Sequence, residues 1–295
     1  MLLVVNNMAF SDANKQEEKF YSQNFSKNYT VFILGSSHVG SINATYVNQV
    51  IKNMRDDVIV YNLATGGDSP QIRIRTLENI AWAKPDLIFY GISSRDFGYP
   101  IIENQILPEP KLFFNKISEN NDFDIFLKNP KIKTLEIIRT ISLNTGIFPS
   151  NTESIESDEY TPFFIYSKHM EETNILNRTG GESTSPQKWN KEFSSNRNWQ
   201  IFTKIIETLH DKKIKIVLFT TPQSRIFLDT LSQEQIEAFN LILNELKQKY
   251  NLKIYDFTNK YEDMNIWNDL THVAFNNDGI IFSEDIANFI TDEIE

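Results

Sequence analysis

Five short apolar runs, separated by segments with helical spacing, organise most of the chain. The first run, Thr30 to Leu34, is continuous and ends at Gly35. Uninterrupted apolar runs of this length are typical of strands that are buried on both faces of a parallel sheet. The remaining predicted strands cover 58–61, 87–90, 215–219 and 252–257.

Helical periodicity fills the intervals between these runs. Apolar residues recur at helical spacing in 42–54, 69–83, 199–211, from 232 onward and from about 279 onward. Ser69 and Pro70 predict an N-cap followed by the first helical residue. Ser232 and Gln235 have the spacing of a capping box. Strands therefore alternate with helices along the chain.

This alternation predicts a three-layer α/β/α domain with a five-stranded parallel sheet. Because crossover connections between parallel strands are right-handed, we expect the strand order 2-1-3-4-5. Residues 1–29 are expected to form an N-terminal extension, with a polar leader or short helix from 11, and residues 30–295 the domain.

About a hundred residues after the third strand, roughly 97–196, do not follow the alternation. A loop of this length in a compact domain is often functional, so one hypothesis is a lid over the active site. The other is a decoration packed at the edge of the sheet. The segment includes a predicted helix near 133–141, an acidic patch at 153–159, and the aromatic residues Phe163, Phe164, Tyr166 and Trp189.

Composition narrows the possible functions. The formal net charge is -10 and no basic stripe is present, so we expect neither nucleic acid nor an anionic membrane to be bound by bulk charge. The chain has no cysteine, which excludes disulfides, thiolate metal sites and a cysteine nucleophile. The apolar start, Met1 to Phe10, is interpreted as a frayed extension or as the stub of a membrane anchor. A cytoplasmic and a cell-envelope location both stay open.

The carboxyl ends of parallel strands meet at one edge of a sheet, where ligands bind. Ser37 follows the first predicted strand and Gly67 the second, and Asp269 and His272 lie in the loop before the last helix. A histidine can take the proton of a serine hydroxyl, and a carboxylate on its other nitrogen fixes its tautomer. The sequence therefore predicts a nucleophilic serine site.

These residues resemble the motifs of the SGNH (GDSL-type) esterase and acyltransferase superfamily. The matching segments are Gly35-Ser36-Ser37, Asn62 to Gly67, Pro85 to Asp96, and Asp269-Leu-Thr-His272. The resemblance covers the strands and helices but not the insertion. It implies a flavodoxin-like sheet, with Ser37 as nucleophile, His272 as base and Asp269 as the group that orients the base. The Ser37 and Gly67 amides would be oxyanion donors.

Two positions depart from the motifs of that superfamily. Ser36 stands where its members have aspartate, a variant similar to membrane-associated, polysaccharide-modifying relatives. Arg95 replaces the oxyanion asparagine; the guanidinium or Ser94 could donate to an oxyanion, and Arg95 could instead bind a carboxylate or a sugar hydroxyl. His38 is either a pocket residue or a surface residue.

We therefore expect a serine esterase or O-acyltransferase that acts on acyl groups, acetyl in particular, of a carbohydrate, without a metal or organic cofactor. A membrane-bound polysaccharide-modification partner is possible. The alternative is a catalytically weak glycan-binding or assembly protein, and a nucleotide binder is disfavoured because the first loop lacks a run of glycines. Trp267 is interpreted as a core residue or a sugar platform, and Asp68 as a helix cap.

Overall fold

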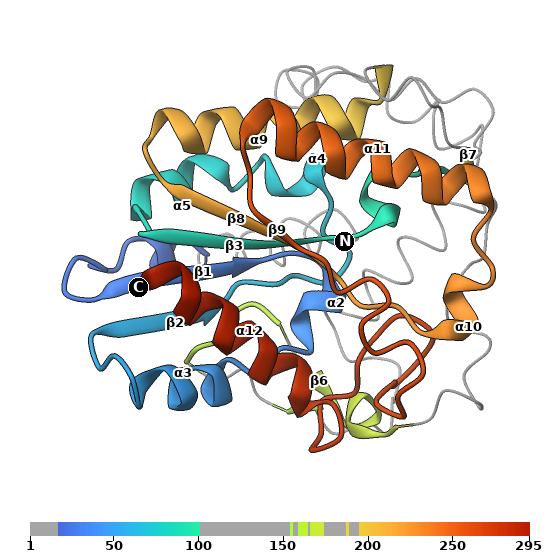
Figure 1. Ribbon diagram of the computed structural model, residues 1–295. Coiled ribbons are helices and arrows are strands. Elements are labelled where there is room, and N and C mark those ends of the chain that lie inside the picture. Colours follow the sequence, from blue (N-terminus) through green and yellow to red (C-terminus); the bar gives the residue numbers. More distant parts are fainter. Residues whose placement is uncertain (1–16, 101–153, 156–158, 165, 174–186, 189–194) are drawn as a thin grey trace, which may run out of the picture.

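The computed structural model of the 295-residue chain describes residues 17–100, 154–155, 159–164, 166–173, 187–188 and 195–295. A five-stranded sheet lies at its centre, in the order β2-β1-β3-β8-β9, and all paired strands are parallel (Figure 1). The strands are β1 (Tyr29–Leu34), β2 (Val58–Asn62), β3 (Leu87–Ile92), β8 (Lys215–Thr220) and β9 (Ile254–Tyr255). The predicted fold class and strand order are confirmed.

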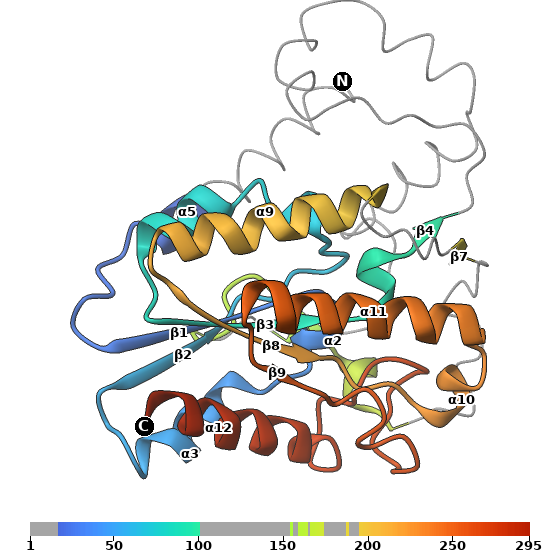
Figure 2. The same cartoon turned by 45° about the horizontal axis from the view of Figure 1, so that its top comes forward.

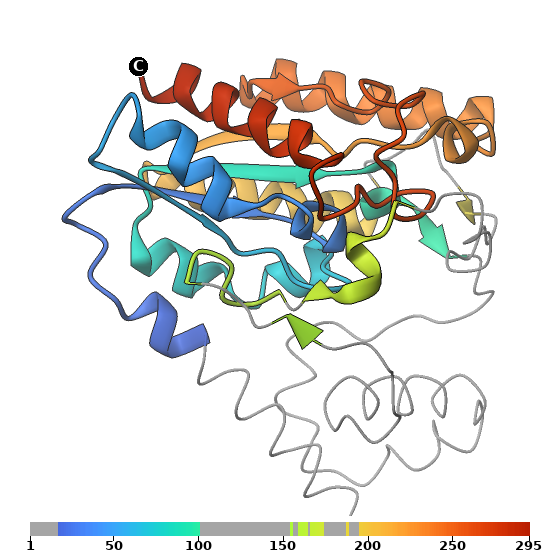
Figure 3. The ribbon, with the colours of Figure 1, turned by 90° about the horizontal axis from the view of Figure 1, so that it is seen from below.

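Helices cover both faces of the sheet. On the upper face in Figure 1 lie α4 (Pro70–Arg73), α5 (Leu77–Ala83), α9 (Arg197–Asp211) and α11 (Gln233–Tyr250), and the tilted view of Figure 2 brings α9 and α11 forward. The lower face carries α3 (Ala44–Lys52) and α12 (Ile280–Ile294), which lie side by side in the view from below (Figure 3).

The alternation of side chains along β1 explains the two cores. Phe32 and Leu34 belong to the hydrophobic cluster under α5, α9 and α11, and Val31 and Ile33 belong to the cluster with α3 and α12. All four side chains have no exposed surface. Both faces of the strand are thus apolar, which is why the run reads as continuous in the sequence.

Local signals placed two helix starts correctly and missed a break inside one helix. Ser69 is the N-cap of α4 with Pro70 in its first turn, and Ser232 and Gln235 form the capping box of α11. The single helix expected to run to Ala83 is instead broken into α4 and α5. The Thr76 hydroxyl donates to the Arg73 carbonyl at 3.1 Å, a side-chain bond that competes with the helical ladder at this point.

The segment before β1 packs against the domain from residue 17 onward. Residues 17–21 include a helical turn, and Phe20 and Tyr21 are 5% and 2% exposed in the core above the sheet. Two short antiparallel pairs lie in the insertion: β4 (Tyr99–Pro100) with β7 (Gln187–Lys188), and β5 (Ser154–Ile155) with β6 (Tyr166–Ser167). The helix expected near 133–141, Trp189 and most of the acidic patch lie outside the described residues.

Candidate active site

Ser37 begins a four-residue helix, α2 (Ser37–Gly40), directly after the turn that ends β1. Gly35 allows this turn because its φ of +150° is one that side chains rarely adopt, and a Cβ there would lie 2.4 Å from the Val39 side chain. The buried Asn62 amide then donates to the carbonyls of Val39 and Ile42, each at 3.0 Å. The nucleophile candidate therefore sits at the start of a short helix whose far end is held by Asn62.

Ser37, His272 and Asp269 form one hydrogen-bonded chain, although 235 residues separate the first two. The Ser37 Oγ lies 2.9 Å from His272 Nε2, and His272 Nδ1 lies 2.9 Å from both carboxylate oxygens of Asp269. Because a carboxylate can only accept, Nδ1 carries the proton and Nε2 is left to accept from the serine. This is the protonation pattern that a serine nucleophile and its base require.

The loop around Asp269 is built to hold a charged carboxylate. Burial alone would raise the pKa of Asp269, but the hydrogen bond and charge of His272 and the backbone N–H groups of Thr271 and His272 outweigh it and hold the pKa at about 2. The two backbone bonds, at 2.9 Å and 2.8 Å, both end on Oδ1. Asp269 therefore stays ionised at neutral pH and keeps the imidazole oriented.

His38 lies against the ring of His272. The two ring centroids are 4.4 Å apart and their planes differ by 5°. The His38 side chain is buried, so its interpretation as a surface residue is wrong. His38 Nδ1 lies 2.8 Å from the Ser36 hydroxyl and Nε2 lies 3.1 Å from the Thr271 hydroxyl, so both ring nitrogens have partners within the protein.

The other predicted site residues lie at the same edge of the sheet. Gly67 is exposed with a φ of +70°, and the space where its Cβ would be is open. Thr65, two residues earlier, donates its amide to the Gly35 carbonyl at 3.1 Å and so ties the loop to the start of α2. Ser94 and Arg95 follow β3 in the 3₁₀ helix η1 (Ser94–Phe97). Burial, His272 when protonated and the Arg95 guanidinium, in that order, lower the pKa of His38.

The described part of the insertion packs beneath the two loops that carry Ser37, Asp269 and His272. Phe164 packs against Gly40, where a Cβ would lie 2.6 Å from its ring, and the Tyr166 hydroxyl donates to the Gly40 carbonyl. Tyr166 also stacks on Phe275, with ring centroids 4.0 Å apart. These contacts support α2 from below. Whether the rest of the insertion is a lid or a decoration stays a prediction.

A run of carbonyls in the insertion also supports the loop between Trp267 and Gly279. Residues 170–172 accept hydrogen bonds from the Phe275 amide at 2.8 Å, from the Asn276 side chain at 2.8 Å and from the Asn268 side chain at 3.0 Å. The loop that presents Asp269 and His272 is thus tied to the insertion through backbone acceptors.

Two residues with open interpretations are resolved by their surroundings. Trp267 is 1% exposed and belongs to the core, so it is not a sugar platform. Asp68 accepts from the Ser69 amide at 2.9 Å and forms a buried ion pair with Arg73 at 2.6 Å. Asp68 is not the cap of α4, which is Ser69; it anchors the loop that carries Gly67 to that helix.

Sequence reasoning missed the supporting roles of Asn62, Thr271 and Tyr166. Asn62 stands in a recognised motif, but its bonds to α2 join residues 20 and 23 apart in the chain. Thr271 is marked only by its place between Asp269 and His272. Tyr166 lies in the insertion, where no pattern links it to Gly40, 126 residues away. Each role depends on a long-range contact that leaves no local signal.

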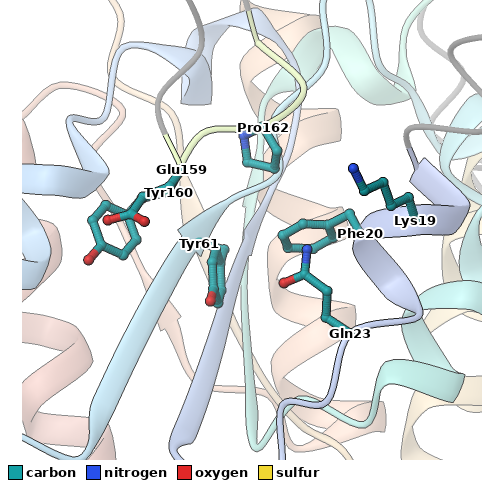
Figure 4. A pocket seen from close by; sticks show the side chains of 7 residues that line it. All are labelled: Lys19, Phe20, Gln23, Tyr61, Glu159, Tyr160 and Pro162. Atoms are coloured by element: carbon teal, nitrogen blue, oxygen red, sulfur yellow. The ribbon is translucent and has the colours of Figure 1, made fainter.

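Within the described residues, no group of three or more His, Asp or Glu side chains could hold a metal ion. No helix there is both long and apolar enough to cross a bilayer. A separate hollow of about 390 Å³ opens beside β2, with Tyr61 between Phe20 and Gln23 on one side and Tyr160 on the other (Figure 4). Ser37, Asp269 and His272 do not line it, and we assign it no part in the chemistry.

Comparison with known proteins gives a distant structural likeness. No protein-family model matches the chain, and no curated protein matches it significantly. The chain is similar in structure to an acetyl xylan esterase, with 12% identity, a TM-score of 0.44, and coverage of 90% of this chain and 100% of the other. It is also similar to a GDSL-like lipase from Bacteroides thetaiotaomicron VPI-5482, with 12% identity, a TM-score of 0.46, and coverage of 97% and 99%.

Proposed function

We propose that this protein is a serine esterase of the SGNH (GDSL) type, with Ser37 as nucleophile, His272 as general base and Asp269 as the residue that orients the base. One observation carries the proposal: the continuous chain from the Ser37 hydroxyl through both nitrogens of His272 to the Asp269 carboxylate, with every step at 2.9 Å. A chance hydrogen bond between a serine and a histidine would not be accompanied by a carboxylate on the other ring nitrogen, which is the group that fixes the tautomer.

The chemistry then has two halves. Ser37 Oγ attacks the ester carbonyl while its proton moves to His272 Nε2, and Asp269 stabilises the imidazolium that forms. The oxyanion faces the amides of Ser37 and Gly67, with Arg95 or Ser94 as a further donor. When the intermediate collapses, His272 returns the proton to the leaving alkoxide and an acyl-Ser37 ester remains. Water, activated by His272, then releases the acid and restores the serine.

We extend the proposal to short acyl esters of a carbohydrate, acetyl in particular. The support is the resemblance of Gly35-Ser36-Ser37 to polysaccharide-modifying relatives. An acceptor hydroxyl in place of water would make the same acyl-enzyme a transferase intermediate, so hydrolysis and transfer differ only in what reaches acyl-Ser37.

The test is the turnover of 4-nitrophenyl esters of increasing acyl length by the purified protein, followed by acetylated sugars. We expect acetate to be the best acyl group and expect Ser37→Ala and His272→Ala to abolish turnover. Ser22→Ala and His210→Ala, both at exposed positions, are the matched controls and should keep wild-type rates. An absence of turnover refutes the proposal and favours the glycan-binding alternative, whereas equal turnover in the Ser37→Ala protein refutes Ser37 as the nucleophile.

A further inference from the structure

A second histidine lies inside the candidate site without a part in the chemistry above. His38 adjoins the proposed nucleophile in sequence, and its ring stacks face to face on the ring of His272 at 4.4 Å. Its side chain is buried, so it is poorly placed to contact a substrate. The stacked arrangement leaves the edge of His272 that carries Nε2 directed at Ser37, at 2.9 Å.

Both nitrogens of His38 are bound by hydroxyl groups, one from each of the two loops that make the site. Ser36 belongs to the loop after β1 that leads into Ser37 (the nucleophile loop), and its hydroxyl lies 2.8 Å from Nδ1. Thr271 belongs to the loop that carries Asp269 and His272 (the base loop), and its hydroxyl lies 3.1 Å from Nε2. Thr271 also donates its amide to Asp269 at 2.9 Å. A chain of contacts therefore runs from Ser36 through His38 and Thr271 to the carboxylate of the triad.

The charges around His38 favour a neutral ring. Burial lowers the pKa of His38 well below its usual range, His272 when protonated and Arg95 lower it further, and Asp269 raises it. A neutral imidazole has one donor and one acceptor, and a hydroxyl can serve either, so Ser36 and Thr271 satisfy the ring in either tautomer. A neutral ring does not repel the imidazolium that forms on His272 when Ser37 reacts.

We propose that His38 is a positioning residue for His272: held between Ser36 and Thr271, its ring fixes the plane of the His272 ring and joins the nucleophile loop to the base loop. This inference rests on the proposed function. Ser36, which stands where the resembling motif has aspartate, thereby acquires a role as the hydroxyl that holds His38. Misplacing a catalytic group by about 1 Å can slow a reaction about 100-fold, so breaking the contacts of His38 with Ser36 or Thr271 should lower the rate at which Ser37 reacts.

The experiment measures how fast a fluorophosphonate labels Ser37, and how many sites are labelled at the end point. For His38→Ala and Thr271→Val we expect the rate constant to fall about 10- to 100-fold while the final stoichiometry stays at one label per chain. His38→Gln, whose amide can still reach a hydroxyl, should recover part of the rate. With 4-nitrophenyl acetate, kcat should fall and KM should stay unchanged, because His38 does not contact substrate.

The outcomes separate the two proposals. If the wild-type protein is not labelled, the proposed function fails. If the wild-type protein is labelled and both Thr271→Val and His38→Ala react at its rate, the inference is overturned. A purely structural role would lower the number of reactive sites and leave the rate per site unchanged, which also overturns it. Thr271→Val keeps the test decisive if His38→Ala does not fold, because valine has nearly the shape of threonine. His210→Ala is the matched histidine control.

Discussion

Replacing Asp269 by asparagine removes one charge from the proposed triad and almost no volume. The carboxylate accepts two backbone bonds on Oδ1, from Thr271 at 2.9 Å and from His272 at 2.8 Å, besides the ring bond to Nδ1. In the variant, the amide oxygen must accept the two backbone bonds, so the NH₂ group turns toward Nδ1. That nitrogen must then accept, and the ring proton moves to Nε2, facing Ser37.

The size of the effect follows from this change of tautomer. A ring protonated at Nε2 cannot take the serine proton, and in serine proteases the equivalent change lowers kcat about 10⁴-fold. At about 1.36 kcal/mol for each factor of ten, this corresponds to about 5.5 kcal/mol of lost transition-state stabilisation. We expect KM to change little, because neither residue binds the ground-state ester.

Asp269→Asn should also lower stability by a predictable amount. A carboxyl group with a pKa of about 2 in the folded protein and about 3.9 in the unfolded chain contributes about 2.6 kcal/mol to the free energy of unfolding at neutral pH. Because the folded pKa is depressed, this stability is present above pH ~4 and is lost as the pH falls toward 2. Urea unfolding at pH 7 should therefore show a loss of about 2 kcal/mol that shrinks at lower pH.

The assay is kcat for 4-nitrophenyl acetate at saturating substrate, corrected for the uncatalysed rate. Asp263→Asn is the matched control. Asp263 precedes Asp269 in the same stretch of sequence, but its side chain is 73% exposed and forms an ion pair with Arg225. Wild-type activity in the control and a loss of less than tenfold in Asp269→Asn would refute the reasoning, since His272 would then act without the carboxylate.

Three further substitutions test the surroundings of the site. Asp68→Ala removes the ion-pair partner of the buried Arg73, so the free energy of unfolding measured with urea should fall by about 3–5 kcal/mol. A fall of less than about 1 kcal/mol contradicts the anchoring role of Asp68. Burial raises the pKa of Asp96 to about 7, although the hydrogen bonds from the Ser93 amide and hydroxyl lower it. The free energy of unfolding should therefore fall by at most about 4 kcal/mol as the pH rises from about 4 to 7. Asp96→Asn should remove this pH dependence, and a dependence that persists in the variant assigns it to another group. Arg95→Ala should lower kcat for 4-nitrophenyl acetate about 10²- to 10³-fold if the guanidinium binds the oxyanion, with partial recovery in Arg95→Asn; an unchanged kcat excludes that role.

The sheet could be predicted because its signals are local. Each central strand, such as β1 with Phe32 and Val31 on opposite faces, is apolar throughout and needs no partner to be recognised. Capping residues likewise placed the starts of α4 and α11. Even so, β9 is shorter than its apolar run, Ile254–Tyr255 in place of 252–257, because only two of its residues pair with β8. The order of the strands followed from crossover handedness together with the common doubly-wound arrangement of such sheets.

The arrangement inside the site was only partly predictable. Ser37, Asp269 and His272 could be nominated from their places after strands and in the last loop, but their distances depend on the whole fold. The stacking of His38 on His272 joins residues 234 positions apart, and no periodicity encodes it. Phe164 and Tyr166 lie in a part of the chain without a regular pattern, and they support α2 through contacts with Gly40. Sequence spacing does not predict such tertiary contacts.

The central claim is that His272 activates the Ser37 hydroxyl, and the most direct measurement is mass spectrometry of the protein after reaction with a fluorophosphonate. We expect one adduct per chain, on Ser37 and not on the adjacent Ser36, and no adduct in His272→Ala. An unmodified Ser37 in the folded wild-type protein, or equal labelling of Ser37 when His272 is removed, would contradict it.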